Sequence, residues 1–159
     1  MYNQLRRCKE KVKWKNLVWH QSNVPRHSFI TWLLLQGRLE TKDRVRKWLP
    51  GVDMKCVFCQ EEESQGHLFF ECEYRCVEES VEYGKPVKVT GKLQGLLLRL
   101  GFCATVYMVW QERNRRFHGK GSREQVAVWK RVVEDVVDRV RVCKGFKKTK
   151  LLRISLNVG

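Results

Sequence analysis

Three cysteines and one histidine lie within seventeen residues near the middle of the 159-residue chain. Cys56 and Cys59 are separated by two residues, so both thiolates can lie on one tight turn and face the same ion. His67 follows after seven residues and Cys72 after a further four. If the HLFFEC segment is helical, His67 and Cys72 lie near one face, and three sulfur atoms and one nitrogen can complete a tetrahedron. The pattern predicts one Zn²⁺ ion that stabilises the fold and has no open coordination position.

The spacing leaves two alternatives open. The same residues could be ordinary cysteines and a buried histidine, because cysteine pairs two residues apart arise by chance in a chain with 7 Cys. Cys76, four residues after Cys72, could replace it as the fourth ligand. Because the number of cysteines is odd and no secretory signal opens the chain, we expect an intracellular, reducing compartment. The other cysteines would then be free thiols or small apolar residues: Cys8, Cys103 and Cys143.

The net charge of +15 is divided unevenly along the chain. Residues 1–54 carry 12 basic and 4 acidic side chains and residues 86–159 carry 17 and 5, whereas residues 55–85 carry 3 and 8. We therefore expect a polyanion to contact the basic flanks and not the metal-binding segment. Trp48, Phe117 and Phe146 lie among the basic residues and could stack on unpaired bases. The predicted RNA contacts are Lys42, Arg44, Arg46, Lys47, Arg113, Arg115, Arg116, Lys120, Lys147, Lys148 and Lys150.

Part of this positive charge has a simpler explanation. For any single residue of the group around Arg44, an ordinary solvated surface is the competing interpretation. The group around Arg115 stands at the end of a predicted helix, where the helix dipole favours positive charge without any ligand.

Apolar residues at helical spacing predict two short helices before the metal-binding segment. Asn23 can cap the first, which carries Pro25 in its first turn and ends at Gly37. Thr41 can cap the second, a basic helix that reaches Trp48. A Pro-Gly pair then leads the chain into the metal-binding segment.

Two long helices are predicted after the metal-binding segment, and we expect them to pack as an antiparallel pair. The first runs over 92–117, with Gly101 as a weak point inside it. Ser122 and Gln125 form a capping box for the second, whose valines make an apolar stripe. A short acidic helix over 77–83 and two strands, over 86–90 and 151–158, complete the predicted elements.

These elements predict a mainly α fold, in which a small zinc-stapled helical domain is joined to a long antiparallel helix pair and a short C-terminal strand. No run of 18 apolar residues is present, so no membrane span is predicted. The first residues are basic enough for a mitochondrial targeting segment, although a solvated basic helix has the same composition. The expected divisions are a basic N-terminal extension (1–13), a zinc-binding domain (14–85), a helical extension (86–143) and a basic linker with a strand (144–159).

A resemblance to a known family is carried by four motifs, in the order VKWKNLVW, VPRHSFITWLLLQGRLETKDRV, CVFCQEEESQGHLFFEC and VYMVWQERNRRFHG. They resemble the zinc-binding domain that follows the polymerase in plant LINE-type (non-LTR) retrotransposon reverse transcriptases, with its C-terminal helical extension. The resemblance runs from about Trp14 to Val142. It implies a nucleic-acid partner, and it implies Cys72 as the fourth ligand in place of Cys76. Two departures are Glu63-Ser64, where the family has Glu-Thr, and the acidic sequence after Cys72.

The chain lacks the paired aspartates of a polymerase. Its aspartates are too scattered to hold two Mg²⁺ ions: Asp43, Asp53, Asp135 and Asp138. A nuclease would need one of four histidines, of which His67 fits better as a metal ligand, and the others lack an evident carboxylate or nucleophile partner: His20, His27 and His118. We therefore expect no catalytic residue.

The expected function is a non-catalytic, zinc-stabilised RNA-binding protein. A narrower expectation is a structural subunit of a large ribonucleoprotein, such as a mitochondrial ribosome, in contact with ribosomal RNA and neighbouring proteins. Neither a membrane nor a small-molecule substrate is expected as a partner. The alternatives are a protein-interaction adaptor and a nucleic-acid-binding accessory domain of a retrotransposon reverse transcriptase.

Overall fold

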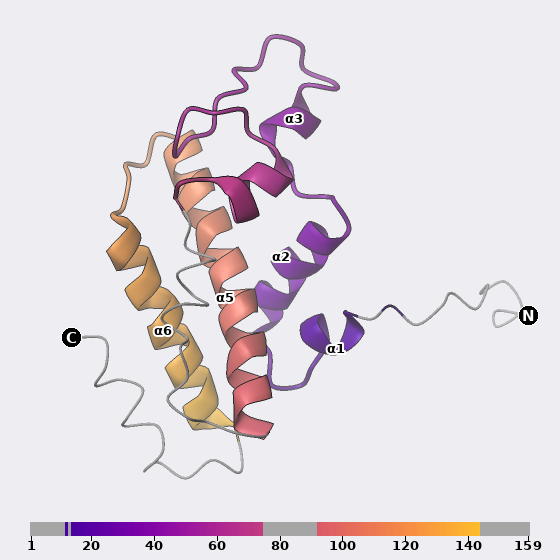
Figure 1. Ribbon diagram of the computed structural model, residues 1–159, viewed down its shortest axis with the longest axis vertical. Helices are drawn as coiled ribbons and strands as arrows, with labels where there is room; N and C mark the ends of the chain where they lie inside the picture. Colours follow the sequence, from indigo (N-terminus) through magenta and orange to yellow (C-terminus); the bar gives the residue numbers. More distant parts are fainter. Residues whose placement is uncertain (1–11, 13, 75–91, 144–159) are drawn as a thin grey trace, which may run out of the picture.

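The computed structural model describes residue 12, residues 14–74 and residues 92–143 (Figure 1). This described part is mainly helical, and in place of a sheet it contains an isolated antiparallel bridge between Lys55 and Glu62. The prediction of a mainly α fold is confirmed, whereas the helix over 77–83 and both predicted strands lie outside the described residues. The helices are α1 (Lys15–Val18), α2 (Pro25–Leu35), α3 (Lys42–Val45), the π-helical turn η2 (His67–Glu71), α5 (Lys92–Phe117) and α6 (Gln125–Val142).

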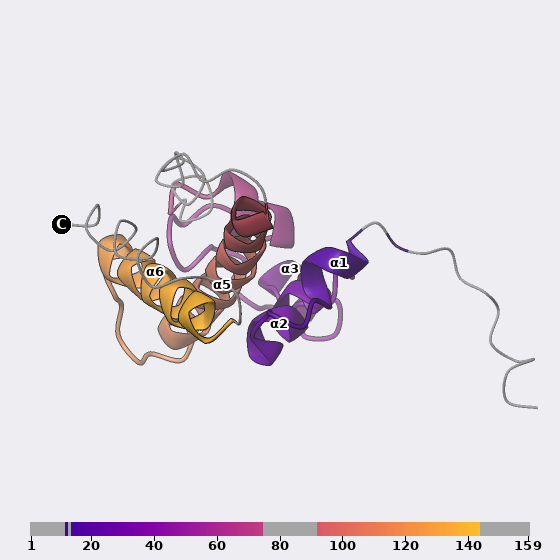
Figure 2. The same ribbon diagram turned by 90° about the horizontal axis from the view of Figure 1, so that it is seen from below.

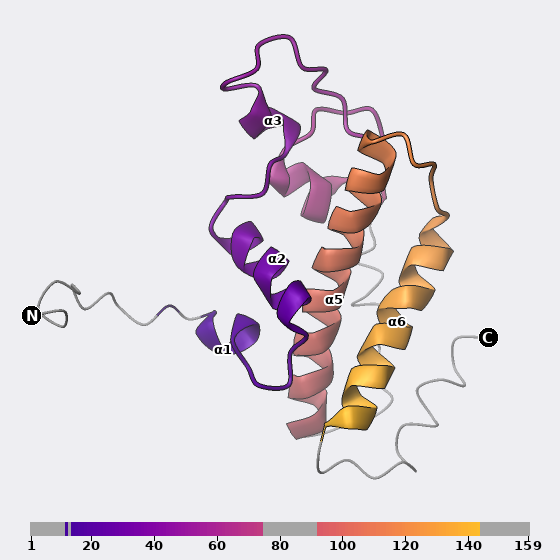
Figure 3. The same ribbon diagram turned by 180° about the vertical axis from the view of Figure 1, so that it is seen from behind.

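Helix α5 is the axis of the molecule. It packs against α2 on one side and α6 on the other, and α6 runs antiparallel to it, as predicted (Figures 1 and 3). The helix continues through Gly101, whose carbonyl also accepts a hydrogen bond from the Thr105 hydroxyl at 2.9 Å. A glycine inside a helix costs about 1 kcal/mol relative to alanine, which the apolar burial on both sides of α5 offsets.

The metal-binding segment is part of the main core. Leu68 and Phe69 of η2 are buried in the same cluster as Leu34 of α2, Val109 of α5 and Val132 of α6. A second, smaller cluster closes the other end of the helix pair, with Leu93, Leu96, Leu100 and Val140 as its buried members. The burial of a side chain of this size contributes about 1.5–3 kcal/mol, so packing on α5 stabilises the segment in addition to a bound ion.

Helix α5 is also long and apolar enough to cross a membrane, judged by length and composition alone. Half of its most apolar stretch is buried inside the protein, against α2 and α6. A long apolar helix that is partly buried against neighbouring helices is expected in the core of a helical domain.

Two predicted helix starts are wrong. The N-cap of α2 is Val24, and the buried Asn23 instead donates hydrogen bonds to the carbonyls of Leu17 and Val18, at 2.7 and 2.8 Å, where it closes α1. The N-cap of α6 is Glu124 without a side-chain cap, so the predicted capping box with Ser122 does not form. The chain before α6 is held by α5 instead, because the Arg123 N–H donates to the Glu112 carboxylate at 2.7 Å.

The end of α2 is as predicted, but α3 is shorter than predicted. Gly37 has a φ of +61°, and the Arg38 N–H donates to the Leu33 carbonyl at 2.8 Å, a common helix ending that requires the left-handed backbone glycine adopts easily. Thr41 is the N-cap of α3, but its side chain makes no capping hydrogen bond. The helix ends at Val45, and single turns carry the chain to Trp48.

Candidate metal centre

Cys56 and Cys59 lie on a tight turn that is closed by backbone hydrogen bonds. The Gln60 N–H donates to the Cys56 carbonyl at 3.1 Å, and the Cys56 N–H donates to the Glu61 carbonyl at 2.5 Å. Gln60 adopts a positive φ of 72°, which reverses the chain. The Phe58 N–H points at the Cys56 sulfur, 3.5 Å away. The turn therefore presents both sulfur atoms on one side, as the spacing predicts.

His67 and Cys72 come from η2, and Ser64 begins this turn. The Ser64 hydroxyl accepts the His67 N–H at 3.0 Å, and the Ser64 carbonyl accepts the Leu68 N–H at 2.9 Å. The Cys72 N–H donates to the His67 carbonyl at 2.8 Å, a five-residue step wider than that of an α-helix. The predicted helical form of this segment is confirmed, and the wide turn places the His67 and Cys72 side chains together.

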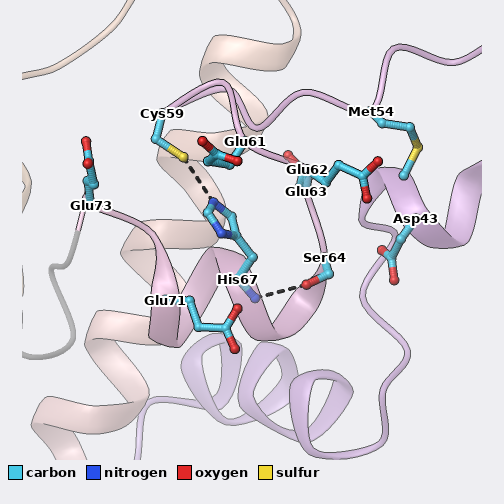
Figure 4. Close-up of a pocket in the computed structure, with 10 residues that line it drawn as sticks. All are labelled: Asp43, Met54, Cys59, Glu61, Glu62, Glu63, Ser64, His67, Glu71 and Glu73. Carbon is cyan, nitrogen blue, oxygen red and sulfur yellow. Dashed lines mark hydrogen bonds between the residues drawn. The ribbon is translucent and has the colours of Figure 1, made fainter.

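The four side chains converge on one point. Their donor atoms all lie within 4.8 Å of one another, and the Cys56 and Cys72 sulfurs are 3.9 Å apart. The Cys59 sulfur lies 3.0 Å from His67 Nε2 (Figure 4). A tetrahedral Zn²⁺ with Zn–S bonds of about 2.3 Å separates its sulfur ligands by about 3.8 Å. The donor set therefore fits one Zn²⁺, which would cross-link the two turns and leave no ligand position for chemistry. Cys76 lies outside the described residues.

The shifted pKa values of the buried Cys56 and Cys72 thiols also favour a bound cation. The hydrogen bond from Cys72 lowers the pKa of Cys56 to about 5, and the same contact, together with burial, raises the pKa of Cys72. Both sulfurs are buried, so two thiolates 3.9 Å apart repel each other unless a cation lies between them. A divalent ion removes this repulsion, and its binding is therefore coupled to the loss of the shared proton.

Glu63 fixes the metal-binding segment to the rest of the protein. Its carboxylate is fully buried and accepts hydrogen bonds from Arg113 of α5, the shortest at 2.7 Å, and from the Lys42 N–H of α3 at 2.9 Å. Sequence reasoning missed this role of Glu63. The Glu63-Ser64 pair could have indicated this role. Glu63 attaches the segment to α3 and α5, and Ser64 begins η2.

A second attachment is made by Arg116 at the end of α5. Its guanidinium lies 4.7 Å from the Phe58 ring centre and 4.8 Å from the Tyr74 ring centre, and these two rings stack at 4.2 Å with an interplanar angle of 6°. Arg116 also donates to the buried Glu112 carboxylate at 2.9 Å. The cation therefore packs against one ring from the Cys56–Cys59 turn and one ring that follows Cys72.

The predicted RNA contacts divide by exposure. Two of them are buried: Arg113 is paired with Glu63, and the Lys42 ammonium donates to the Lys55 carbonyl at 2.6 Å. Arg44 is partly buried and donates to the Gly37 carbonyl. Arg115 and Arg116 are also partly buried, and the fully exposed members are Arg46, Lys47 and Lys120. Lys147, Lys148 and Lys150 lie outside the described residues.

Acidic side chains surround the outer side of the metal centre. A pocket of about 450 Å³ opens beside Cys59 and His67 (Figure 4). Among the residues that the structure describes, no basic residue lines it, whereas six acidic residues do: Asp43, Glu61, Glu62, Glu63, Glu71 and Glu73. The acidic character predicted for this segment is therefore concentrated on one face.

His27 does have a carboxylate neighbour, so the prediction that it lacks one is wrong. Its Nε2 lies 3.3 Å from the Asp135 carboxylate of α6, and its ring packs on Tyr107 of α5 at 4.6 Å. Only 2% of the residue is exposed, and burial lowers the pKa of His27 to about 4. This histidine joins three helices and is closed to a substrate.

The fold and the metal centre define a small helical domain in which a Cys₃His zinc site is attached to a long helix pair. Residues 1–77, just under half of the chain, match the family whose description is zinc-binding in reverse transcriptase. The predicted resemblance and the predicted zinc ligands are confirmed. The match covers all four ligands and ends before α5 and α6. No curated protein and no solved structure matches the chain.

Proposed function

We propose that this protein is a non-catalytic, zinc-stabilised RNA-binding protein, in which the metal centre holds the shape of the domain and basic side chains elsewhere contact phosphates. The observation that supports the proposal is the separation of charge. Among the residues that the structure describes, six acidic and no basic side chains line the pocket at the metal centre, whereas the chain as a whole carries 32 basic against 17 acidic residues. A polyanion is repelled by the acidic pocket and attracted by exposed basic side chains elsewhere, such as Arg46, Lys47 and Lys120.

The contact surface that we propose joins the ends of α3 and α5. Arg46, Lys47 and Trp48 are exposed at the end of α3, and Phe117 and Lys120 are exposed at the end of α5. The start of α3 lies beside the end of α5, because the buried Lys42 ammonium lies 5.8 Å from the Phe117 ring centre. We call these five exposed residues the α3–α5 surface. It combines cations for phosphates with rings for unpaired bases.

The test is RNA affinity as a function of salt concentration. Each phosphate contact to a single strand contributes about 0.7 to the slope of log affinity against log salt, so Arg46→Gln with Lys47→Gln should reduce the slope by up to about 1.4. The matched control is Lys130→Gln with Arg131→Gln, which removes the same charge from exposed positions of α6, on the other side of α5 (Figures 1 and 2). Equal slopes for both double variants, or RNA affinity that does not depend on salt, would refute the proposed surface.

Membership of a large ribonucleoprotein stays a prediction, and so does a role as a protein-interaction adaptor. Sedimentation of the tagged protein tests the first, because a permanent subunit migrates with the particle and not as a small species. Deletion of residues 151–159 tests the second. Loss of protein partners with unchanged RNA affinity would favour the adaptor.

A further inference from the structure

A row of aromatic side chains lies on the outer surface of α1 and α2, away from the metal centre. Trp19 is 52% exposed and Phe29 is 51% exposed, and the partly buried Trp32 lies between them. The ring centres are 6.4 Å apart from Trp19 to Trp32 and 5.9 Å apart from Trp32 to Phe29. The Arg38 guanidinium lies 5.9 Å from the Trp32 ring centre. We call these four residues the aromatic row.

The aromatic row is not needed for the packing of α2. The buried face of α2 carries His27, Thr31 and Leu34, and it faces α5, where His27 packs on Tyr107. Phe29 and Trp32 occupy the opposite face of the helix, and Trp19 and Arg38 lie outside its two ends. Single exposed apolar residues are ordinary, but neighbouring large rings that remain half exposed mark a binding surface.

The charge around the row favours a polyanion over a basic or neutral partner. Residues 11–39 contain no aspartate or glutamate, and they contain five lysines and arginines. Arg38 is exposed beside Trp32, whereas Arg26 is engaged by Asp135 of α6 at 3.3 Å. Rings combined with an exposed guanidinium have the composition of a platform for single-stranded nucleic acid.

We propose that the aromatic row stacks on the unpaired bases of bound RNA, with Arg38 contacting a phosphate or stacking on a base. The inference rests on the proposed RNA-binding function, but the surface is distinct from the α3–α5 surface. The rings of the aromatic row would stack on unpaired bases, and the α3–α5 surface would supply most of the phosphate contacts. The protein should therefore prefer single-stranded RNA to a duplex of the same length.

The chain offers a closely matched pair of variants for the test. Phe29→Leu removes a ring from the row, and Phe70→Leu removes a ring with the same exposed fraction, 51%, from the metal-binding segment. Affinity for a short oligouridylate is measured by fluorescence anisotropy on zinc-loaded full-length protein. We expect Phe29→Leu and Trp32→Leu each to weaken binding by about 5- to 150-fold, the range for loss of one stacked base, without a change in the salt slope. Phe70→Leu should bind as the unmodified protein does.

The outcomes separate this inference from the proposed function. If the unmodified protein binds with a steep salt dependence but both row variants bind equally well, the aromatic row is not a stacking surface and the RNA-binding proposal stands. If the unmodified protein does not bind RNA, both fail. Circular dichroism and zinc content show whether Trp32→Leu is folded, and Phe29→Leu tests the row independently. A dimer that Trp32→Leu converts to a monomer, or binding to anionic lipid vesicles in place of RNA, would also overturn the inference.

Discussion

The buried ion pair between Glu63 and Arg113 gives the sharpest prediction about stability. Glu63 is fully buried, 4% of Arg113 is exposed, and three nitrogen–oxygen contacts of 2.7, 3.2 and 3.3 Å join them. Removal of one partner from such a pair leaves a buried charge without compensation, which costs about 3–5 kcal/mol. Glu63→Ala also removes the acceptor of the Lys42 N–H. We therefore expect Glu63→Ala to lower the free energy of unfolding by at least about 3 kcal/mol.

The assay is urea or thermal unfolding at a fixed concentration of free zinc, because a bound ion adds to the apparent stability. For a domain of this size the expected loss corresponds to a decrease in Tm of about 6–20 °C. Glu62→Ala is the control, since Glu62 is the exposed neighbour in the same segment. The double variant Glu63→Leu with Arg113→Met should be more stable than Glu63→Ala alone, because no buried charge is left unpaired. A loss below about 1 kcal/mol for Glu63→Ala, equal to that of Glu62→Ala, would refute the reasoning.

Three further predictions concern the metal centre and the helix contacts. Cys72→Ser should reduce bound zinc from one ion per chain to well below one, measured by atomic emission, whereas Cys103→Ser, at a buried cysteine outside the ligand set, should leave it unchanged. Ser64→Ala should cost about 1 kcal/mol in urea unfolding through the lost hydrogen bond to the His67 N–H, and Ser64→Thr should cost little. The pKa of His27 is about 4 in the folded protein and 6.5 without burial. The contribution of the neutral His27 side chain to the free energy of unfolding is therefore complete above pH 6.5 and is lost as pH falls toward 4. This contribution amounts to roughly 3 kcal/mol. Between pH 6.5 and 4 the free energy of unfolding of His27→Gln should therefore fall by about that much less than that of the unmodified protein. Parallel pH profiles for the two proteins would contradict the prediction.

The metal ligands could be predicted from the sequence because their geometry is local. Two cysteines two residues apart must share a turn, and the distance along the chain to His67 and Cys72 is short enough that one further turn brings all four together. The long helices were predictable for a similar reason, since the apolar spacing of α5 repeats over seven turns and is little affected by one glycine.

Contacts between distant residues could not be read from local patterns. Arg113 belongs to a basic run at a helix end, which favours a solvated cation, but Glu63 lies fifty residues earlier and meets it only in the fold. The same holds for Asn23, which has the residue type of an N-cap but donates backward to close α1. Likewise the N-terminus of α6 needs no capping box, because Glu112 of α5 accepts the hydrogen bond that a cap would otherwise supply.

The docking of the metal-binding segment explains why its outer face is acidic. Glu63 turns inward to Arg113, and Arg116 turns toward Phe58 and Tyr74, so two cations of α5 are used inside the protein where they bind the segment. The neighbouring carboxylates Glu61 and Glu62 remain exposed at the pocket, and no cation is found among the described residues that line it. The zinc site adds no positive charge to this face, because three thiolates outweigh one divalent ion. A phosphate backbone is therefore repelled from the metal centre, and the RNA that we propose as the partner would be restricted to the remaining surface, where the α3–α5 surface and the aromatic row lie.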